Sequence, residues 1–192
     1  MKRAFFVILA ILVSVVSFAQ SATDAKYGIG KVPVENGKVT FVREISFDSS
    51  AISAETALDN IGSWSRGRFA KPIVLAGRIR ETEAGVFYIN AEEYITFKQT
   101  ALITDRSRIN YNITISISGS TCTFKMTDIE YLYEEERDGG TRFTAEDWIT
   151  DQEAFNRAGT KMLKTTGKFR VKTIDLVDQL EKDIAELEDS AC

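Results

Sequence analysis

The chain has 192 residues, 44% of them hydrophobic, which suits one globular domain with a sizeable core. Acidic residues outnumber basic ones by 28 to 24, and the resulting net charge of −4 opposes binding to the phosphate backbone of nucleic acids. The sequence contains no histidine, which excludes serine–histidine and cysteine–histidine nucleophile pairs and removes the commonest metal ligand.

The amino terminus has the three parts of a secretory signal peptide. A basic start, Met1-Lys2-Arg3, precedes an apolar run over residues 4–16, and small residues follow in Ser17-Phe18-Ala19. We therefore expect residues 1–19 to be removed, leaving a periplasmic or extracellular chain that begins near Gln20. The apolar run is short for a bilayer span and no cysteine follows it to carry a lipid, so we expect no membrane span in the mature chain.

Residues 20–37 show no hydrophobic period, because glycines, Pro33 and the turn pair Asn36-Gly37 interrupt it, and we expect a loosely held N-terminal arm. Residues 39–47 alternate as a strand does, with Arg43 as the polar exception on the apolar side. Ser53 then has the position of a helix N-cap, with Glu55 in the first turn.

The predicted first helix ends before Pro72, where Arg66, Arg68 and Lys71 suit the negative end of the helix dipole. Its expected apolar face comprises Ala54, Ala57, Leu58, Ile61, Trp64 and Phe69. Residues 73–80 predict a second strand, 81–85 a turn, and 86–97 a third strand or one broken near Asn90-Ala91.

Residues 108–126 carry the clearest pattern, in which isoleucines and Tyr111 alternate with Asn, Thr and Ser. Gly119-Ser120 suits the loop of a type II′ hairpin, with Gly119 at positive φ. This turn would pair Ile117 with Cys122, Ile115 with Phe124 and Ile113 with Met126 on an apolar face. On the polar face it would pair Ser118 with Thr121, Ser116 with Thr123 and Thr114 with Lys125. Turn chemistry and periodicity thus select the same register.

Beyond Met126 the apolar positions change parity, which predicts a β-bulge near Thr127-Asp128. Residues 134–140 predict a charged loop, after which the spacing is helical. Thr144 with Asp147, and Thr150 with Glu153, have the spacing of helix starts, and the second pair matches a capping box.

Gly159 and Gly167 are expected to interrupt these helices, and Thr173 to cap the last one. Its apolar stripe comprises Ile174, Val177, Leu180, Ile184 and Leu187. We expect this stripe to pack on the sheet face that carries Ile113, Ile115 and Phe124, which gives helices on one side of an antiparallel sheet.

Several local motifs carry a resemblance to a known family. They are N-G-K-V-T-F at residues 36–41, S-A-E-T-A-L at 53–58 with Trp64, the glycine turn at Gly85, Y-N-I-T-I-S-I at 111–117 and C-T-F-K-M-T-D-I at 122–129. In these the chain resembles secreted proteins of Gram-negative gut bacteria with a domain of unknown function and a TATA-binding-protein-like (TBP-like) fold. The resemblance covers about half of the mature chain and supplies no catalytic residues.

The predicted fold class is α+β: an antiparallel sheet of about five strands with helices packed on one face, in the order β-α-β-β-β-β-α, plus a C-terminal helical extension. The predicted segments are a signal peptide (1–19), an N-terminal arm (20–37), the TBP-like domain (38–133) and the extension (134–192). This extension is longer than the family's simplest members have.

Candidate catalytic and metal-binding groups are few. Glu92, Glu93, Asp128 and Glu130 could serve a carboxylate-based hydrolase of glycans or envelope polymers, but no spacing selects a pair, and solvated strand-edge charges explain them. Asp147, Asp151 and Glu153 lack the glycine-centred loop of a calcium site. We therefore predict no catalytic residue, metal or cofactor.

Cys122 and Cys192 could form a disulfide in an oxidising compartment, although Cys122 has the parity of a buried residue. Four tyrosines lie on predicted strands, namely Tyr88, Tyr94, Tyr131 and Tyr133. They could pack in the core or line a ligand surface, and we expect that they pack in the core.

The polar face of the hairpin is the predicted binding surface. Its residues are Asn110, Asn112, Thr114, Ser116, Thr123 and Lys125, which together would form a flat, neutral surface rich in hydroxyl groups. We hypothesise a non-catalytic module that binds an envelope protein or a glycan there. An ordinary solvated face is the plainer interpretation, and the hydrolase is the enzymatic alternative.

Overall fold

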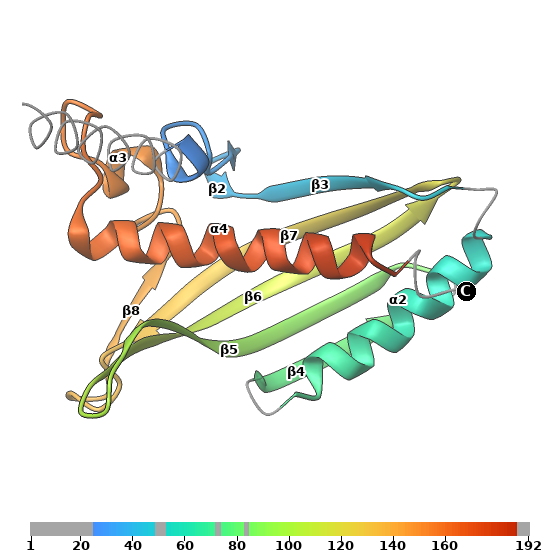
Figure 1. Ribbon diagram of the computed structural model, residues 1–192, viewed down its shortest axis with the longest axis horizontal. Helices are drawn as coiled ribbons and strands as arrows, with labels where there is room; N and C mark the ends of the chain where they lie inside the picture. Colours follow the sequence, from blue (N-terminus) through green and yellow to red (C-terminus); the bar gives the residue numbers. More distant parts are fainter. Residues whose placement is uncertain (1–24, 49–52, 72–73, 83–84, 188–192) are drawn as a thin grey trace, which may run out of the picture. The chain divides into compact units, whose positions relative to one another are not determined.

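The computed structural model describes residues 25–48, 53–71, 74–82 and 85–187 (Figure 1). The chain divides into two compact units, Met1–Lys31 and Val32–Cys192. In the first, residues 25–27 are helical and the Lys31 amide donates to the Gly28 carbonyl. Within the described ranges no helix is both long and apolar enough to cross a membrane. All that follows concerns the second unit.

A small hairpin opens this unit. Strands β1 (Val34–Glu35) and β2 (Lys38–Val39) pair around Asn36 and Gly37, whose φ angles are 51° and 77°. Positive φ at both central residues is the geometry that Asn-Gly favours in a two-residue hairpin. The segment predicted as an arm therefore contains a strand.

The main sheet is antiparallel and has six strands. They are β3 (Phe41–Ser46), β4 (Val74–Glu81), β5 (Phe87–Gln99), β6 (Thr104–Ser118), β7 (Thr121–Tyr133) and β8 (Thr141–Thr144). Their order is β3-β7-β6-β5-β4, and β8 pairs with the part of β7 beyond β3. The expected α+β architecture is confirmed, with β8 as the additional strand.

The predicted hairpin register is confirmed in full. Gly119 has φ 61°, Ile115 lies opposite Phe124, and Thr114 lies opposite Lys125. The bulge is confirmed as well: Asn110 pairs with Glu130 but Asn112 pairs with Thr127, so one residue of β6 faces two of β7. Strand β5 runs unbroken through residues 90–91, and its pairing with β6 shifts register between residues 96 and 98.

Helix α2 (Ala54–Phe69) begins as predicted, since the Ser53 hydroxyl accepts a hydrogen bond from the Thr56 amide at 3.1 Å. Ala57, Ile61 and Phe69 are buried, but Ala54 is exposed. Arg68 lies in the last turn, as predicted, and its side chain is buried.

The segment after residue 140 differs most from prediction. Residues 141–144 form strand β8, because Phe143 lies opposite Tyr131 and stacks on Trp148 at 4.1 Å between centroids. The short helix α3 (Asp151–Ala154) has no capping box: the Thr150 hydroxyl donates to the Glu146 carbonyl, 3.2 Å away, and the Glu153 amide donates to the Thr150 carbonyl.

Helix α4 (Lys164–Ala185) runs through both residues that were expected to delimit it. At Gly167 the helix approaches Met162 so closely that a Cβ added to the glycine would lie 2.5 Å from the Met162 Cγ. This glycine therefore permits a close contact and does not interrupt the helix. Thr173 is buried and hydrogen-bonds the Tyr131 hydroxyl at 2.6 Å, so it is no cap. The predicted apolar stripe is buried, except Leu187, which is half-buried beyond the helix end.

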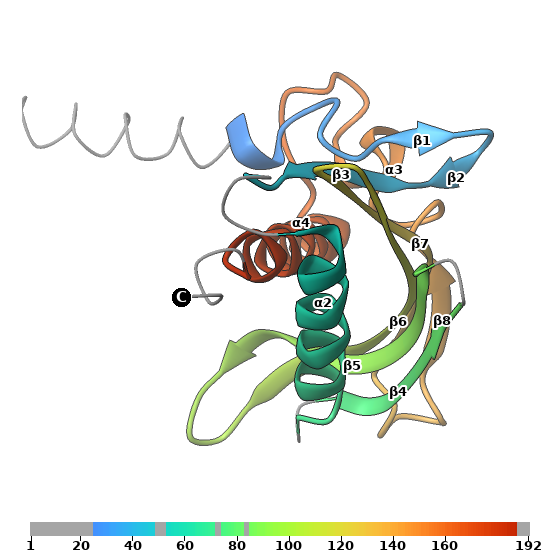
Figure 2. The same cartoon turned by 90° about the vertical axis from the view of Figure 1, so that its right-hand side faces the viewer.

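The core lies between the sheet and these two helices. The sheet curves around α2 and α4, which pack on its concave face (Figure 2). The apolar side chains of β5, β6 and β7 point to this face, where Ile89, Ile113 and Phe124 are almost fully buried. The opposite, convex face carries the alternate residues of the same strands.

Candidate functional site

The convex face of the sheet holds the predicted binding residues. Asn110, Asn112, Thr114, Ser116 and Thr123 are half-buried there, and Lys125 is exposed. The register of β4, β5 and β6 extends this face sideways, placing Arg80 beside Tyr88 and Thr114, and Arg78 beside Asn90 and Asn112.

A depression of about 440 Å³ lies in this part of the face. Its lining comes from four strands and comprises Arg78, Arg80, Tyr88, Ile89, Asn90, Asn112, Ile113, Thr114, Thr127 and Asp128. The structure thus brings Asn112 and Thr114 into one concavity. Ser116, Thr123 and Lys125 lie further along the sheet, toward the turn at residues 119–120.

Side-chain amides form the floor of the depression. The Asn90 amide donates to the Oδ1 atoms of Asn112 and Asn110, at 2.9 and 3.3 Å, and the Asn112 amide donates to Asp128 Oδ2 at 3.0 Å. Asp128 is the bulge residue, with φ 52°, so the irregularity of β7 places its carboxylate at the end of this chain. The amides are therefore held in fixed orientations by one another.

Two arginines border the depression. Arg78 and Arg80 are exposed on the edge strand β4 and, being two residues apart, share its convex side. The Arg80 guanidinium lies over the Tyr88 ring, 4.5 Å from its centroid. In the part of the chain that the structure describes, neither arginine forms an ion pair, so both guanidinium groups can bind an anionic group of a ligand.

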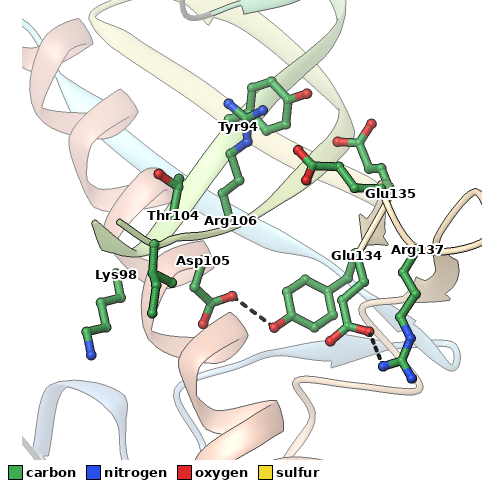
Figure 3. A pocket seen from close by; sticks show the side chains of 11 residues that line it. Tyr94, Lys98, Thr104, Asp105, Arg106, Glu134, Glu135 and Arg137 are labelled. Carbon is green, nitrogen blue, oxygen red and sulfur yellow. Dashed lines mark hydrogen bonds and ion pairs between the residues drawn. The ribbon is translucent and has the colours of Figure 1, made fainter. Parts of the chain in front are cut away.

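A larger cavity, of about 590 Å³, lies at one end of the sheet, between the β5–β6 hairpin and the β7–β8 loop (Figure 3). The Arg106 guanidinium stacks on the Tyr94 ring at 3.9 Å. Glu135 is held by Arg108, whose Nε donates at 2.6 Å, and this bond lowers the pKa of the Glu135 carboxyl. The Glu135 carboxylate is thus bound to Arg108 and serves to hold this wall of the cavity together.

The other wall contains a second charged group. Lys168 donates to Asp105 at 2.8 Å and to the Tyr133 hydroxyl at 2.7 Å, and its ammonium lies 4.4 Å from the Phe97 centroid. Burial raises the pKa of Tyr133 above its usual value, even though the Lys168 hydrogen bond opposes this shift. Four acids line the cavity, and three of them are paired: Asp105 with Lys168, Glu134 with Arg137 and Glu135 with Arg108. Among the described residues only Glu136 has no ion pair, so the cavity does not offer the two free carboxyl groups that hydrolysis needs.

The four acids considered for a hydrolase lie on opposite faces of the sheet. Glu93 is on the concave face, 3% exposed, and both its oxygens lie 2.9 Å from Arg68 Nη2. Glu92 faces the other way and pairs with Arg108 at 3.4 Å. Asp128 lines the depression, and Glu130 is exposed opposite Asn110. The described residues also include no cluster of cysteine and acidic side chains that could hold a metal ion.

The tyrosines divide between the two roles that the sequence left open. Tyr131 is buried, as expected for a core residue, and the Tyr133 hydroxyl accepts a hydrogen bond from Lys168. Tyr88 and Tyr94 lie instead on the convex side, each under an arginine.

Cys122 is fully buried beneath the helices. Burial raises the pKa of its thiol to about 12, so it stays protonated at physiological pH. The proposed disulfide partner, Cys192, lies outside the described residues.

Sequence reasoning missed Arg78 and Arg80, and with them the charge of the surface. The alternation R-I-R at residues 78–80 was readable as a strand with two arginines on one side. That this side adjoins Asn90 and Asn112 depends on the pairing of β4 with β5. The convex face is therefore positively charged along its β4 edge, beside the six residues that the sequence predicted as a neutral surface.

Comparison with known proteins finds a family match and two similar crystal structures. Residues 52–132 match the family described as a domain of unknown function (DUF4468) with TBP-like fold. A DUF4468 family protein from Bacteroides ovatus is 31% identical, with a TM-score of 0.77 over 86% of this chain and 94% of that one. A TBP-like protein from Parabacteroides distasonis is 20% identical, with a TM-score of 0.67 over 82% and 97% of the two chains. No curated protein matches.

Proposed function

This chain belongs to the DUF4468 family of TBP-like fold, whose function is unknown, and we propose that it is a non-catalytic module that binds a carboxylate-bearing glycan on its convex face. The observation that carries the proposal is the depression in which Arg78 and Arg80 face a floor of ordered amides. The helices occupy the concave face, which leaves the convex face for a ligand (Figure 2).

The chemistry of the depression matches an acidic sugar. A guanidinium group presents paired N–H donors that fit a carboxylate, and Arg78 and Arg80 provide two such groups. Amide and hydroxyl groups, here Asn90, Asn112 and Thr114, both donate and accept hydrogen bonds, as sugar hydroxyls do. The ring of Tyr88, which is 41% exposed, adds an apolar surface for the C–H face of a sugar.

A glycan fits this surface better than a protein does. The volume of about 440 Å³ is in the range of small-molecule sites, and every lining residue except Ile89 and Ile113 carries a polar side-chain group. Stable protein interfaces bury a larger area around an apolar, aromatic centre. The hydrolase alternative receives no support from the geometry, because Glu93 lies on the other face and Glu92 is paired with Arg108.

Export is part of the proposal. Its support is the basic start, the apolar run and the small residues of positions 1–19, which have the pattern of a signal peptide. An exported module would meet envelope glycans in the periplasm or outside the cell. Mass spectrometry of the chain from its host should give an amino terminus near Gln20, and an intact Met1 would contradict export.

Binding to two polymers tests the ligand class. We expect the purified chain to bind polygalacturonate in preference to uncharged dextran. Replacing Arg78 and Arg80 together by alanine should weaken binding by roughly tenfold to a hundredfold, as expected for lost hydrogen bonds to a charged group. Isothermal titration calorimetry measures the dissociation constants.

The matched control is Arg142→Ala, which removes an exposed arginine of β8 outside the depression and should leave affinity unchanged. Equal losses in the double variant and the control would contradict a specific site. Release of reducing ends from the polymer would show hydrolysis and overturn the non-catalytic assignment.

A further inference from the structure

The tip of the β5–β6 hairpin exposes two large apolar side chains. The turn is closed by the Thr100 amide, which donates to the Ile103 carbonyl at 2.8 Å. Leu102 is 94% exposed and Ile103 59%, the two largest exposures among the large hydrophobic residues that the structure describes in this unit. Adjacent exposed Leu and Ile side chains on a hairpin tip are unfavourable in water unless another apolar phase covers them.

An apolar groove lies at the same end of the unit. It has a volume of about 360 Å³ and is lined by Phe97, Met162, Leu163, Gly167, Lys168, Val171 and Lys172. Phe97 belongs to β5, the strand that leads into the hairpin, and the other residues belong to the start of α4 and the loop before it. Leu163 is 42% exposed. Figure 1 shows the hairpin and the start of α4 at one end of the sheet.

Basic residues surround these apolar groups. Lys98 and Arg106 flank the tip on β5 and β6, and Lys161 and Lys164 flank Met162 and Leu163. In the described ranges, Lys98, Lys161 and Lys164 form no ion pair. The acids that adjoin the hairpin are Asp105, which is paired with Lys168, and three glutamates of the β7–β8 loop. Of these, Glu134 is paired with Arg137 and Glu135 with Arg108, which leaves Glu136 as the one unpaired acid among the described residues that line this cavity.

From this combination we propose that the hairpin tip and the groove dock on an anionic lipid bilayer. Leu102, Ile103 and Leu163 would enter the interface, while the lysines contact anionic headgroups. A second copy of the chain fits less well, because a two-fold contact through this end would place the same lysines against each other. The proposal is independent of the glycan site, which lies on β4, β5, β6 and β7 in another part of the sheet.

Vesicle co-sedimentation tests the proposal. The chain from residue 20 onward retains every described element and lacks the apolar run of residues 4–16, which could itself enter a bilayer. We expect it to bind vesicles of phosphatidylcholine mixed with phosphatidylglycerol. Replacing Leu102 and Ile103 together by serine should weaken this binding by at least about tenfold. Leu75→Ser, at a residue of β4 that is 45% exposed, is the matched control and should have no effect.

Charge reversal provides the second arm. Lys98→Glu with Lys164→Glu should weaken binding to the anionic vesicles by about fivefold or more per lysine, but leave binding to pure phosphatidylcholine unchanged. Lys125→Glu, an exposed lysine on the convex face, is its control. Unchanged binding by the tip variant, or no binding by the wild-type chain, would overturn the proposal. A dimer that dissociates in the tip variant would also overturn it and assign the tip to a second copy.

Discussion

Glu93 has a structural role that could not be inferred from the residues next to it in the sequence. Glu92 and Glu93 are adjacent acids on one strand, yet they point to opposite faces of the sheet. Glu93 lies under α2, where it binds Arg68 through both oxygens and accepts a hydrogen bond from the Tyr111 hydroxyl. Burial together with the Glu93 charge raises the pKa of Tyr111 well above its usual value. The charged pair is therefore a buried link between helix and sheet.

Removing the Glu93 charge should destabilise the fold strongly. Glu93→Gln leaves the Arg68 guanidinium buried without a counter-charge, and we expect a loss of about 3–5 kcal/mol in the free energy of unfolding. Glu92→Gln breaks only the partly exposed contact with Arg108 and should cost about 1 kcal/mol or less. Urea denaturation measures both values. Similar losses in the two variants would contradict the assignment of Glu93 as a structural residue.

Among the secondary-structure elements, the contact of α2 with the edge strand β4 depends on a glycine. A Cβ added to Gly77 would lie 2.8 Å from the Phe69 carbonyl oxygen and 2.9 Å from the Phe69 Cβ. Neither atom can move without shifting the end of the helix. The absence of a side chain at Gly77 is what lets α2 lie against β4, the strand that carries Arg78 and Arg80.

Alanine at two glycines should therefore have opposite effects. Gly77→Ala should lower the free energy of unfolding by about 1–3 kcal/mol, because the new methyl group overpacks the contact. Gly67→Ala, at an exposed position of α2 with no atom near the added Cβ, should raise it by up to about 1 kcal/mol through helix propensity. Thermal or urea melts compare the two variants. Stabilisation by Gly77→Ala would show that the approach of α2 to β4 is looser than described.

Elements fixed by local chemistry were predictable from the sequence, and those fixed by distant partners were not. The register at Gly119 and the bulge at Asp128 follow from turn geometry and side-chain alternation within one hairpin. Strand β8 was predicted as helix because its strand state depends on pairing with β7 and on the stack of Phe143 with Trp148. Thr173 was predicted as an N-cap from its position in the sequence, but its hydroxyl forms a hydrogen bond with the hydroxyl of Tyr131, 42 residues away.

At the scale of the whole molecule, the sequence predicted which face is open but not what that face binds. Alternation along β6 and β7 was sufficient to separate the polar residues from the apolar ones. The two arginines that give the surface its charge come from β4, whose position at the sheet edge follows from its pairing with β5. The site is therefore a product of topology, and no single stretch of sequence contains it.

Chemical-shift mapping tests the central claim, that the convex face is the ligand-binding face, most directly. Backbone amide spectra would be recorded as an oligogalacturonate is titrated into the ¹⁵N-labelled chain. We predict that the perturbed amides cluster on β4, β5 and β6 around Arg78, Arg80, Asn90 and Asn112, and that those of α4 stay unchanged. Perturbations confined to the β5–β6 hairpin tip or to α2 and α4, with none around the depression, would contradict the claim.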